Sequence, residues 1–122
     1  MKTVIQGIIG ISSIALNLIS SSNLSAVAGN HIWQGTGRII NGAGEGSTVE
    51  LTLRIVNNEV TFLSGPSQNE RIILRSASPL IGEGKTKAGS WQVLQTEEKT
   101  IGVTLAQENP YRLIRYILKA QS

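Results

Sequence analysis

Apolar and polar residues alternate with a period of two between Thr48 and Val56. Valine, leucine and isoleucine occupy every second position, and glutamate, threonine and arginine lie between them. Successive side chains of a β-strand point to opposite faces, so this pattern is typical of a strand with one buried face. Apolar residues recur at every second position in residues 91–95 and 100–106 as well. The pattern predicts an all-β fold.

Turn residues separate the expected strands. Asn57-Asn58 is predicted to be a two-residue hairpin turn, because asparagine tolerates a left-handed backbone. Three consecutive apolar residues make 71–75 a strand that we expect to be covered on both faces, and Ser78-Pro79 is expected to begin a loop that continues through Gly89. The expected strands are residues 31–40, 48–56, 59–64, 71–75, 91–95, 100–106 and 111–118.

The last of these segments fits two structures. As a strand, 111–118 places Ile114, Tyr116 and Leu118 on one face. As a helix, it would begin with Asn109 as N-cap and Pro110 at the first helical position, where both residues are favoured. We expect a strand, because the rest of the chain is a succession of strands and a closing strand would cover an exposed edge. About seven short strands joined mostly by short turns indicate a single small antiparallel barrel or sandwich.

The first expected strand opens with Trp33-Gln34-Gly35. This opening resembles that of the small calycin barrels, the lipocalin and avidin relatives, although those families place a glycine where this chain has His31. The resemblance implies a barrel that binds a small apolar ligand inside. Gly35 and Gly37 lie on one face of the strand and leave room for a bend or for a large neighbouring side chain.

The first 28 residues have the order of a secretory signal peptide. Lys2 precedes an apolar run, Val4–Ile19, and a polar stretch then leads to Ala26-Val27-Ala28, which supplies small residues three and one before a cut. Glycine and polar residues interrupt the run, whereas a membrane-spanning helix needs roughly 20 mainly apolar residues. We therefore expect cleavage near Ala28. Residues 29–122 then form one β-rich domain, secreted or periplasmic, with no membrane association.

Composition excludes several kinds of chemistry. The chain has no cysteine and one histidine, and all of its acidic residues are glutamate, so a Ser-His-Asp triad cannot be assembled within one chain and a zinc site is not expected. Glu97 and Glu98 are adjacent and are expected to be solvated turn residues. No catalytic residue is assigned, and a Glu-dependent carbohydrate-active enzyme is kept as an alternative. A formal net charge of +3 is too small to indicate a nucleic-acid partner.

The expected function is that of a non-catalytic binding or interaction module, with a small-molecule ligand or a protein as its partner. Trp33, Trp91 and Tyr116 are the candidate ligand-binding residues, because aromatic side chains are common in binding sites. An exported domain without disulfides is held by packing and strand pairing alone, and an oligomer would also meet this need.

A second hypothesis concerns the new N-terminus. Cleavage after Ala28 would give a chain that starts with Gly29-Asn30-His31. A free amine, two deprotonated amide nitrogens and the imidazole would form a four-nitrogen site of the tetragonal kind that suits Cu(II) or Ni(II). The alternative is a passive histidine just ahead of the first strand. No other cofactor is expected.

Overall fold

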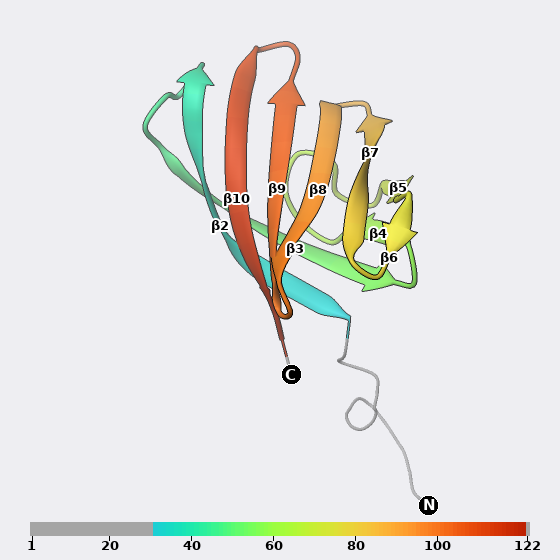
Figure 1. The fold of residues 1–122 in the computed structure, drawn as a ribbon. Helices are drawn as coiled ribbons and strands as arrows, with labels where there is room; N and C mark the ends of the chain where they lie inside the picture. Colours follow the sequence, from blue (N-terminus) through green and yellow to red (C-terminus); the bar gives the residue numbers. More distant parts are fainter. Residues whose placement is uncertain (1–30, 122) are drawn as a thin grey trace, which may run out of the picture. The chain divides into compact units, whose positions relative to one another are not determined.

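The computed structural model describes residues 31–121, and these residues form an all-β structure (Figure 1). The chain divides into two units. Trp33–Lys119 make up one of them. The other comprises residues 1–32 and 120–122; within its described part, the Gln121 amide donates a hydrogen bond to the Ile32 carbonyl oxygen at 2.8 Å. The predicted signal peptide, residues 1–28, lies outside the described residues.

Nine strands are present among the described residues, and they form one antiparallel sheet. Their bounds are β2 (Ile32–Gly42), β3 (Thr48–Val56), β4 (Glu59–Phe62), β5 (Arg71–Ile73), β6 (Ser76–Ala77), β7 (Leu80–Thr86), β8 (Gly89–Glu97), β9 (Thr100–Gln107) and β10 (Arg112–Ala120). Their order in the sheet is β5-β4-β3-β2-β10-β9-β8-β7-β6. The first and last described strands therefore pair in the middle, with a run of hairpins on either side (Figure 1).

The sheet curls into a half-barrel, and one short segment connects its two ends. Residues 71–77 pair with β4 through β5 and with β7 through β6. Strand β5 also packs against β7. Two glycines of β7 make this approach close: a Cβ on Gly82 would lie 2.7 Å from the Cα of Leu74, and one on Gly84 would lie 2.7 Å from the Cβ of Ile72.

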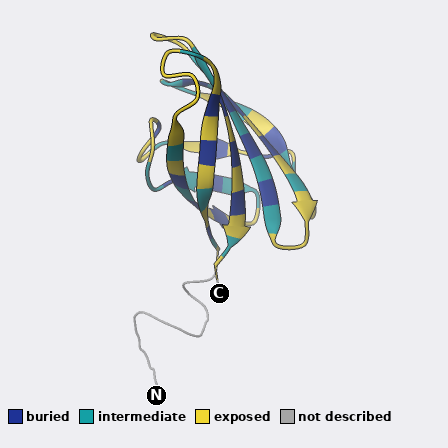
Figure 2. Ribbon diagram, turned by 90° about the vertical axis from the view of Figure 1, so that its left-hand side faces the viewer, coloured by how far each residue is buried: buried dark blue, intermediate teal, exposed yellow. Residues whose placement is uncertain are grey.

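Buried and exposed residues alternate along the strands (Figure 2). In β3, Leu51, Leu53 and Ile55 are buried, as their period-two spacing predicts. Strands β8, β9 and β10 follow the same rule, and their inward side chains form the core of the half-barrel. The largest fully buried side chains are Trp91, Tyr116, Phe62, Leu51, Leu53, Leu74, Ile101, Leu105, Ile114, Leu118, Val60 and Val103.

The all-β prediction is confirmed, and residues 112–120 are a strand instead of a helix. The loop expected from Ser78 to Gly89 is wrong, since most of it is β7. Gly82 and Gly84 suggested a loop. Both positions lack room for a side chain, because Leu74 and Ile72 pack directly against them. This error, together with β6, accounts for nine strands in place of about seven.

One local prediction needs correction, and another is confirmed. Residues 71–75 are not covered on both faces: Ile72 and Leu74 are buried, but Ile73 is 58% exposed. The two-residue hairpin turn at Asn57-Asn58 is confirmed, since Val56 pairs with Glu59 on either side of it. Asn57 adopts the left-handed conformation with φ of 56°, and the Asn58 side chain donates a hydrogen bond to the Leu74 carbonyl oxygen at 3.0 Å.

Candidate functional site

The three aromatic residues proposed from the sequence lie in the core. Trp91 is 0% exposed, Tyr116 1% and Trp33 8%. The Trp91 ring packs against Phe62 with a centroid distance of 4.4 Å and stacks on Tyr116 at 6.0 Å. Burial raises the pKa of Tyr116 to about 12, and the positive charge of Arg112 offsets a smaller part of this shift. These side chains therefore pack the interior of the sheet.

The polar edge of Trp91 is also bonded within the protein. Its indole N–H donates to the hydroxyl oxygens of Ser67 and Thr86, both at 3.0 Å, and these two hydroxyls are themselves 2.6 Å apart. Ser67 is fully buried and belongs to the turn between β4 and β5. A buried indole usually needs such a partner, so this network is sufficiently explained by folding.

His31 is exposed and precedes β2. Gly29 and Asn30, the other residues of the predicted copper motif, lie outside the described residues. Within residues 31–121, no group of three or more His, Cys, Asp or Glu side chains could hold a metal ion.

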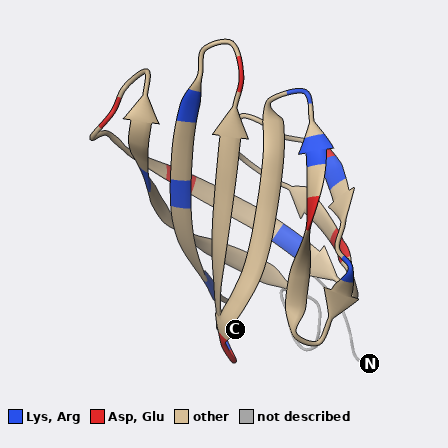
Figure 3. Ribbon diagram, turned by 45° about the horizontal axis from the view of Figure 1, so that its top comes forward, with Lys and Arg blue, Asp and Glu red and all other residues tan. Residues whose placement is uncertain are grey.

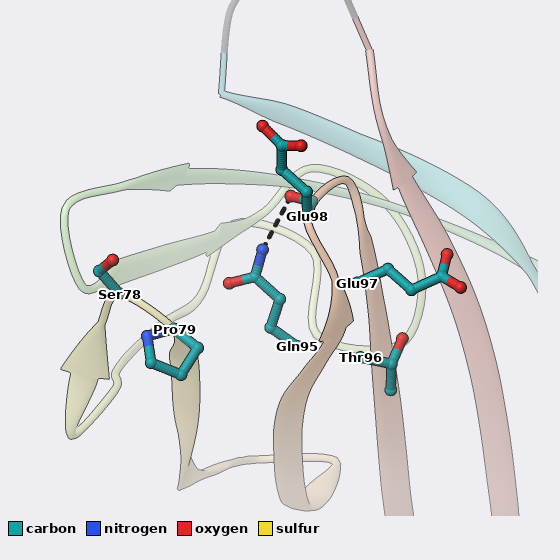
Figure 4. A pocket seen from close by; sticks show the side chains of 6 residues that line it. All are labelled: Ser78, Pro79, Gln95, Thr96, Glu97 and Glu98. Atoms are coloured by element: carbon teal, nitrogen blue, oxygen red, sulfur yellow. Dashed lines mark hydrogen bonds between the residues drawn. The ribbon is translucent and has the colours of Figure 1, made fainter.

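A hollow of about 410 Å³ lies at one end of the sheet, between the turn that precedes β7 and the end of β8 (Figure 4). Gln95 links β7 to the turn after β8, because its side-chain oxygen accepts from the Leu80 amide at 2.9 Å and its side-chain nitrogen donates to the Glu98 carbonyl oxygen at 2.8 Å. Glu97 and Glu98 are exposed and point in different directions (Figure 4). The two carboxylates do not form the close pair that Glu-dependent hydrolysis uses.

A second hollow, of about 340 Å³, lies on the outer face of β8, β9 and β10. Two rows of outward-facing residues cross the three strands here, each residue directly opposite its neighbour in the ladder. We call this hollow the outer groove. Its apolar row is Leu94, Gly102 and Ile117, and its polar row is Gln92, Thr104 and Arg115.

The floor of the outer groove exists because residue 102 has no side chain. Its neighbours Leu94 and Ile117 are 53% and 58% exposed, so the gap between them is open to solvent. A Cβ built on Gly102 would meet no atom nearer than the Leu94 carbonyl oxygen, at 3.8 Å. The backbone there does not have the positive φ that favours glycine. Neither packing nor conformation within the described residues therefore requires glycine at this position.

A glycine inside a strand weakens the strand, and it often marks a place where a ligand or another backbone approaches closely. The sequence carries this signal, since Gly102 falls on the polar side of the alternation in 100–106. Aromatic residues alone do not point to this position. The groove itself requires the pairing of β8 with β9 and of β9 with β10, which places Leu94 and Ile117 on either side of Gly102.

No helix in the described part of the chain is long and apolar enough to cross a membrane. Comparison with known proteins finds no family model, no curated protein and no solved structure that matches the chain.

Proposed function

We propose that this protein is an exported, non-catalytic binding module that holds the apolar part of a small ligand in the outer groove. The observation that carries the proposal is Gly102. Its missing side chain opens a hollow between two exposed apolar side chains, and nothing in the surrounding structure needs that space.

The size of the groove favours a small ligand. Small-molecule sites usually measure roughly 300–1,000 Å³ and combine an apolar lining with a few polar groups. The outer groove, at about 340 Å³, lies at the lower end of that range. It also has both kinds of lining, since Leu94 and Ile117 are apolar and Thr104 and Arg115 are polar.

The core favours a site on the outer face over one inside the sheet. Trp91 and Tyr116 are fully buried and stacked on each other, and Leu51 and Leu105 are fully buried as well. A ligand inside would have to displace these contacts, and large changes in a close-packed core destabilise the fold by several kcal/mol (about 2–5). The outer groove is open without any such change.

The test is titration with N-phenyl-1-naphthylamine, a neutral dye whose emission rises in apolar surroundings. We expect saturable binding to the wild-type protein at about one dye per chain. Gly102→Val should abolish it, because the new side chain fills the floor of the groove. Thr61→Val is the matched control: it adds a valine on β4, away from the groove, and should leave the affinity unchanged.

The variants must be folded for the comparison to be valid, which the near-UV circular dichroism of the buried aromatic residues reports. Equal dye binding by wild-type protein and by folded Gly102→Val would overturn the proposal. An absence of saturable binding to the wild-type protein would overturn it too.

A further inference from the structure

Two arginine side chains lie at the polar side of the outer groove. Arg115 lines the groove from β10, and Arg38 lies on the outward face of β2, the strand that borders β10. The two strands are in close contact here: a Cβ on Gly37, the residue before Arg38, would lie 2.8 Å from the Arg115 carbonyl oxygen. Both arginines are exposed. They are therefore neighbouring like charges on one surface.

No carboxylate among the described residues forms an ion pair with either arginine. The ion pairs between described residues are Arg71 with Glu59 and Arg75 with Glu83, and none of these residues belongs to β2 or β10. Strand β9, which forms the centre of the groove, carries no charged residue. Figure 3 shows basic segments along β10 beside an uncharged β9.

Like charges on adjacent strands destabilise a sheet, because they repel each other. A bound anion would remove this repulsion. Thr104 and Gln92 continue the row from Arg115 across β9 and β8, and a hydroxyl and an amide can both donate hydrogen bonds to an anion. The groove thus has donors and positive charge on one side and an apolar floor on the other.

We propose that the ligand of the outer groove is a small amphipathic anion. Its apolar body lies over Gly102 between Leu94 and Ile117, and its single negatively charged group lies at Arg115, where the charge of Arg38 adds to the attraction. A planar guanidinium suits this role because it can bond both oxygens of a carboxylate, sulfonate or phosphate. This inference rests on the proposed function, and it adds the charge of the ligand and the direction in which it binds.

Two dyes that differ in one group test the inference. The first is the neutral N-phenyl-1-naphthylamine, and the second is 8-anilinonaphthalene-1-sulfonate, which has the same ring skeleton with a sulfonate added. We expect the wild-type protein to bind the sulfonate about twofold to fivefold more tightly, the effect that a single exposed ion pair can supply. Raising the ionic strength should reduce this preference, because salt screens exposed charges.

Substitution of the arginines then locates the charge. Arg115→Gln should remove the preference for the sulfonate dye, because it should weaken the binding of the sulfonate far more than the binding of the neutral dye. Arg115→Lys should restore part of the preference, and Arg38→Gln should lower it by a smaller factor. Arg54→Gln is the matched control, since Arg54 is exposed on β3, beyond β2, and should not affect either dye.

The two proposals fail in different ways. If both dyes bind equally well, and Arg115→Gln changes neither affinity, the anion inference is wrong while the groove remains a binding site. If Gly102→Val leaves the binding of both dyes unchanged, the groove itself is not the site, and both proposals are wrong. A preference for the sulfonate that survives Arg115→Gln would also overturn the inference.

Discussion

Replacement of Gly102 by alanine is expected to stabilise this protein while it impairs binding. Glycine within a strand costs roughly 0.5–1 kcal/mol relative to alanine, mainly through the conformational freedom of the unfolded chain. Alanine recovers this free energy only where its Cβ has room and the backbone is not left-handed. Both conditions hold here, since the nearest atom to that Cβ is the Leu94 carbonyl oxygen at 3.8 Å and φ is not positive.

The expected gain is measurable. In a domain of this size, 1 kcal/mol shifts the midpoint of thermal unfolding by about 4–8 °C, so Gly102→Ala should raise Tm by roughly 2–8 °C. Gly102→Val should raise it further, because a branched side chain between Leu94 and Ile117 adds cross-strand contacts of about 0.2–1 kcal/mol each. Thermal melts and urea denaturation, both followed by circular dichroism, measure the change.

Gly37→Ala is the matched control for this reasoning. It makes the same chemical change within a strand, but the new Cβ would lie 2.5 Å from the Tyr116 ring. Overpacking of this kind typically destabilises by about 1–3 kcal/mol. Two results would refute the claim that packing does not require glycine at position 102. One is a folded Gly102→Ala protein that is less stable than wild type. The other is a Gly37→Ala protein whose stability rises as much as that of Gly102→Ala.

Three further outcomes are expected. The double change Ser67→Ala and Thr86→Val should lower the free energy of unfolding by about 1–3 kcal/mol in urea, because it leaves the buried Trp91 N–H without an acceptor; an unchanged midpoint would mean that water replaces both hydroxyls. Stability should fall by up to about 3 kcal/mol as the pH rises from 10 to 12, because the folded state keeps Tyr116 protonated up to a pKa of about 12 whereas the unfolded chain loses that proton near 10. Tyr116→Phe should flatten this part of the profile, and an identical slope in the variant would assign it to other groups. Protein cleaved after Ala28 should bind one Cu(II) per chain, more tightly at higher pH, and calorimetric titration should show no such binding after His31→Ala; retention of the wild-type affinity would exclude the N-terminal motif.

Alternation predicted which faces of the long strands are buried. In β10, Ile114, Tyr116 and Leu118 share one face and are all buried, as the strand interpretation requires. The local sequence favoured a helix there, with good capping residues. Pairing with β9 along its whole length decides the outcome, because a strand in the middle of a sheet gains contacts on both edges that an isolated helix would lack.

The segment around β7 could not be predicted in the same way. Its glycines, Gly82 and Gly84, are usual signals of a loop. They are explained only by the approach of Leu74 and Ile72 from a part of the chain that is distant in the sheet. The same limit applies to the two arginines of the groove, since Arg38 and Arg115 become neighbours through the pairing of the first and last strands. Period and propensity describe one strand at a time, and neither contains this information.

Glycine itself has opposite meanings in different strands of this sheet, and the difference separates folding from function. Gly37 and Gly84 each have a neighbour pressed against the position where a Cβ would be, so their absence of side chains is part of the packing. Gly102 has open space above it on the outer face of the sheet, and the fold would accept a larger residue there. A chain without a disulfide relies on its packed core for stability, and this core uses its aromatic side chains for that purpose. A destabilising glycine is best explained in such a chain by something that binds there, and the row of polar residues that ends in Arg115 indicates what charge it carries.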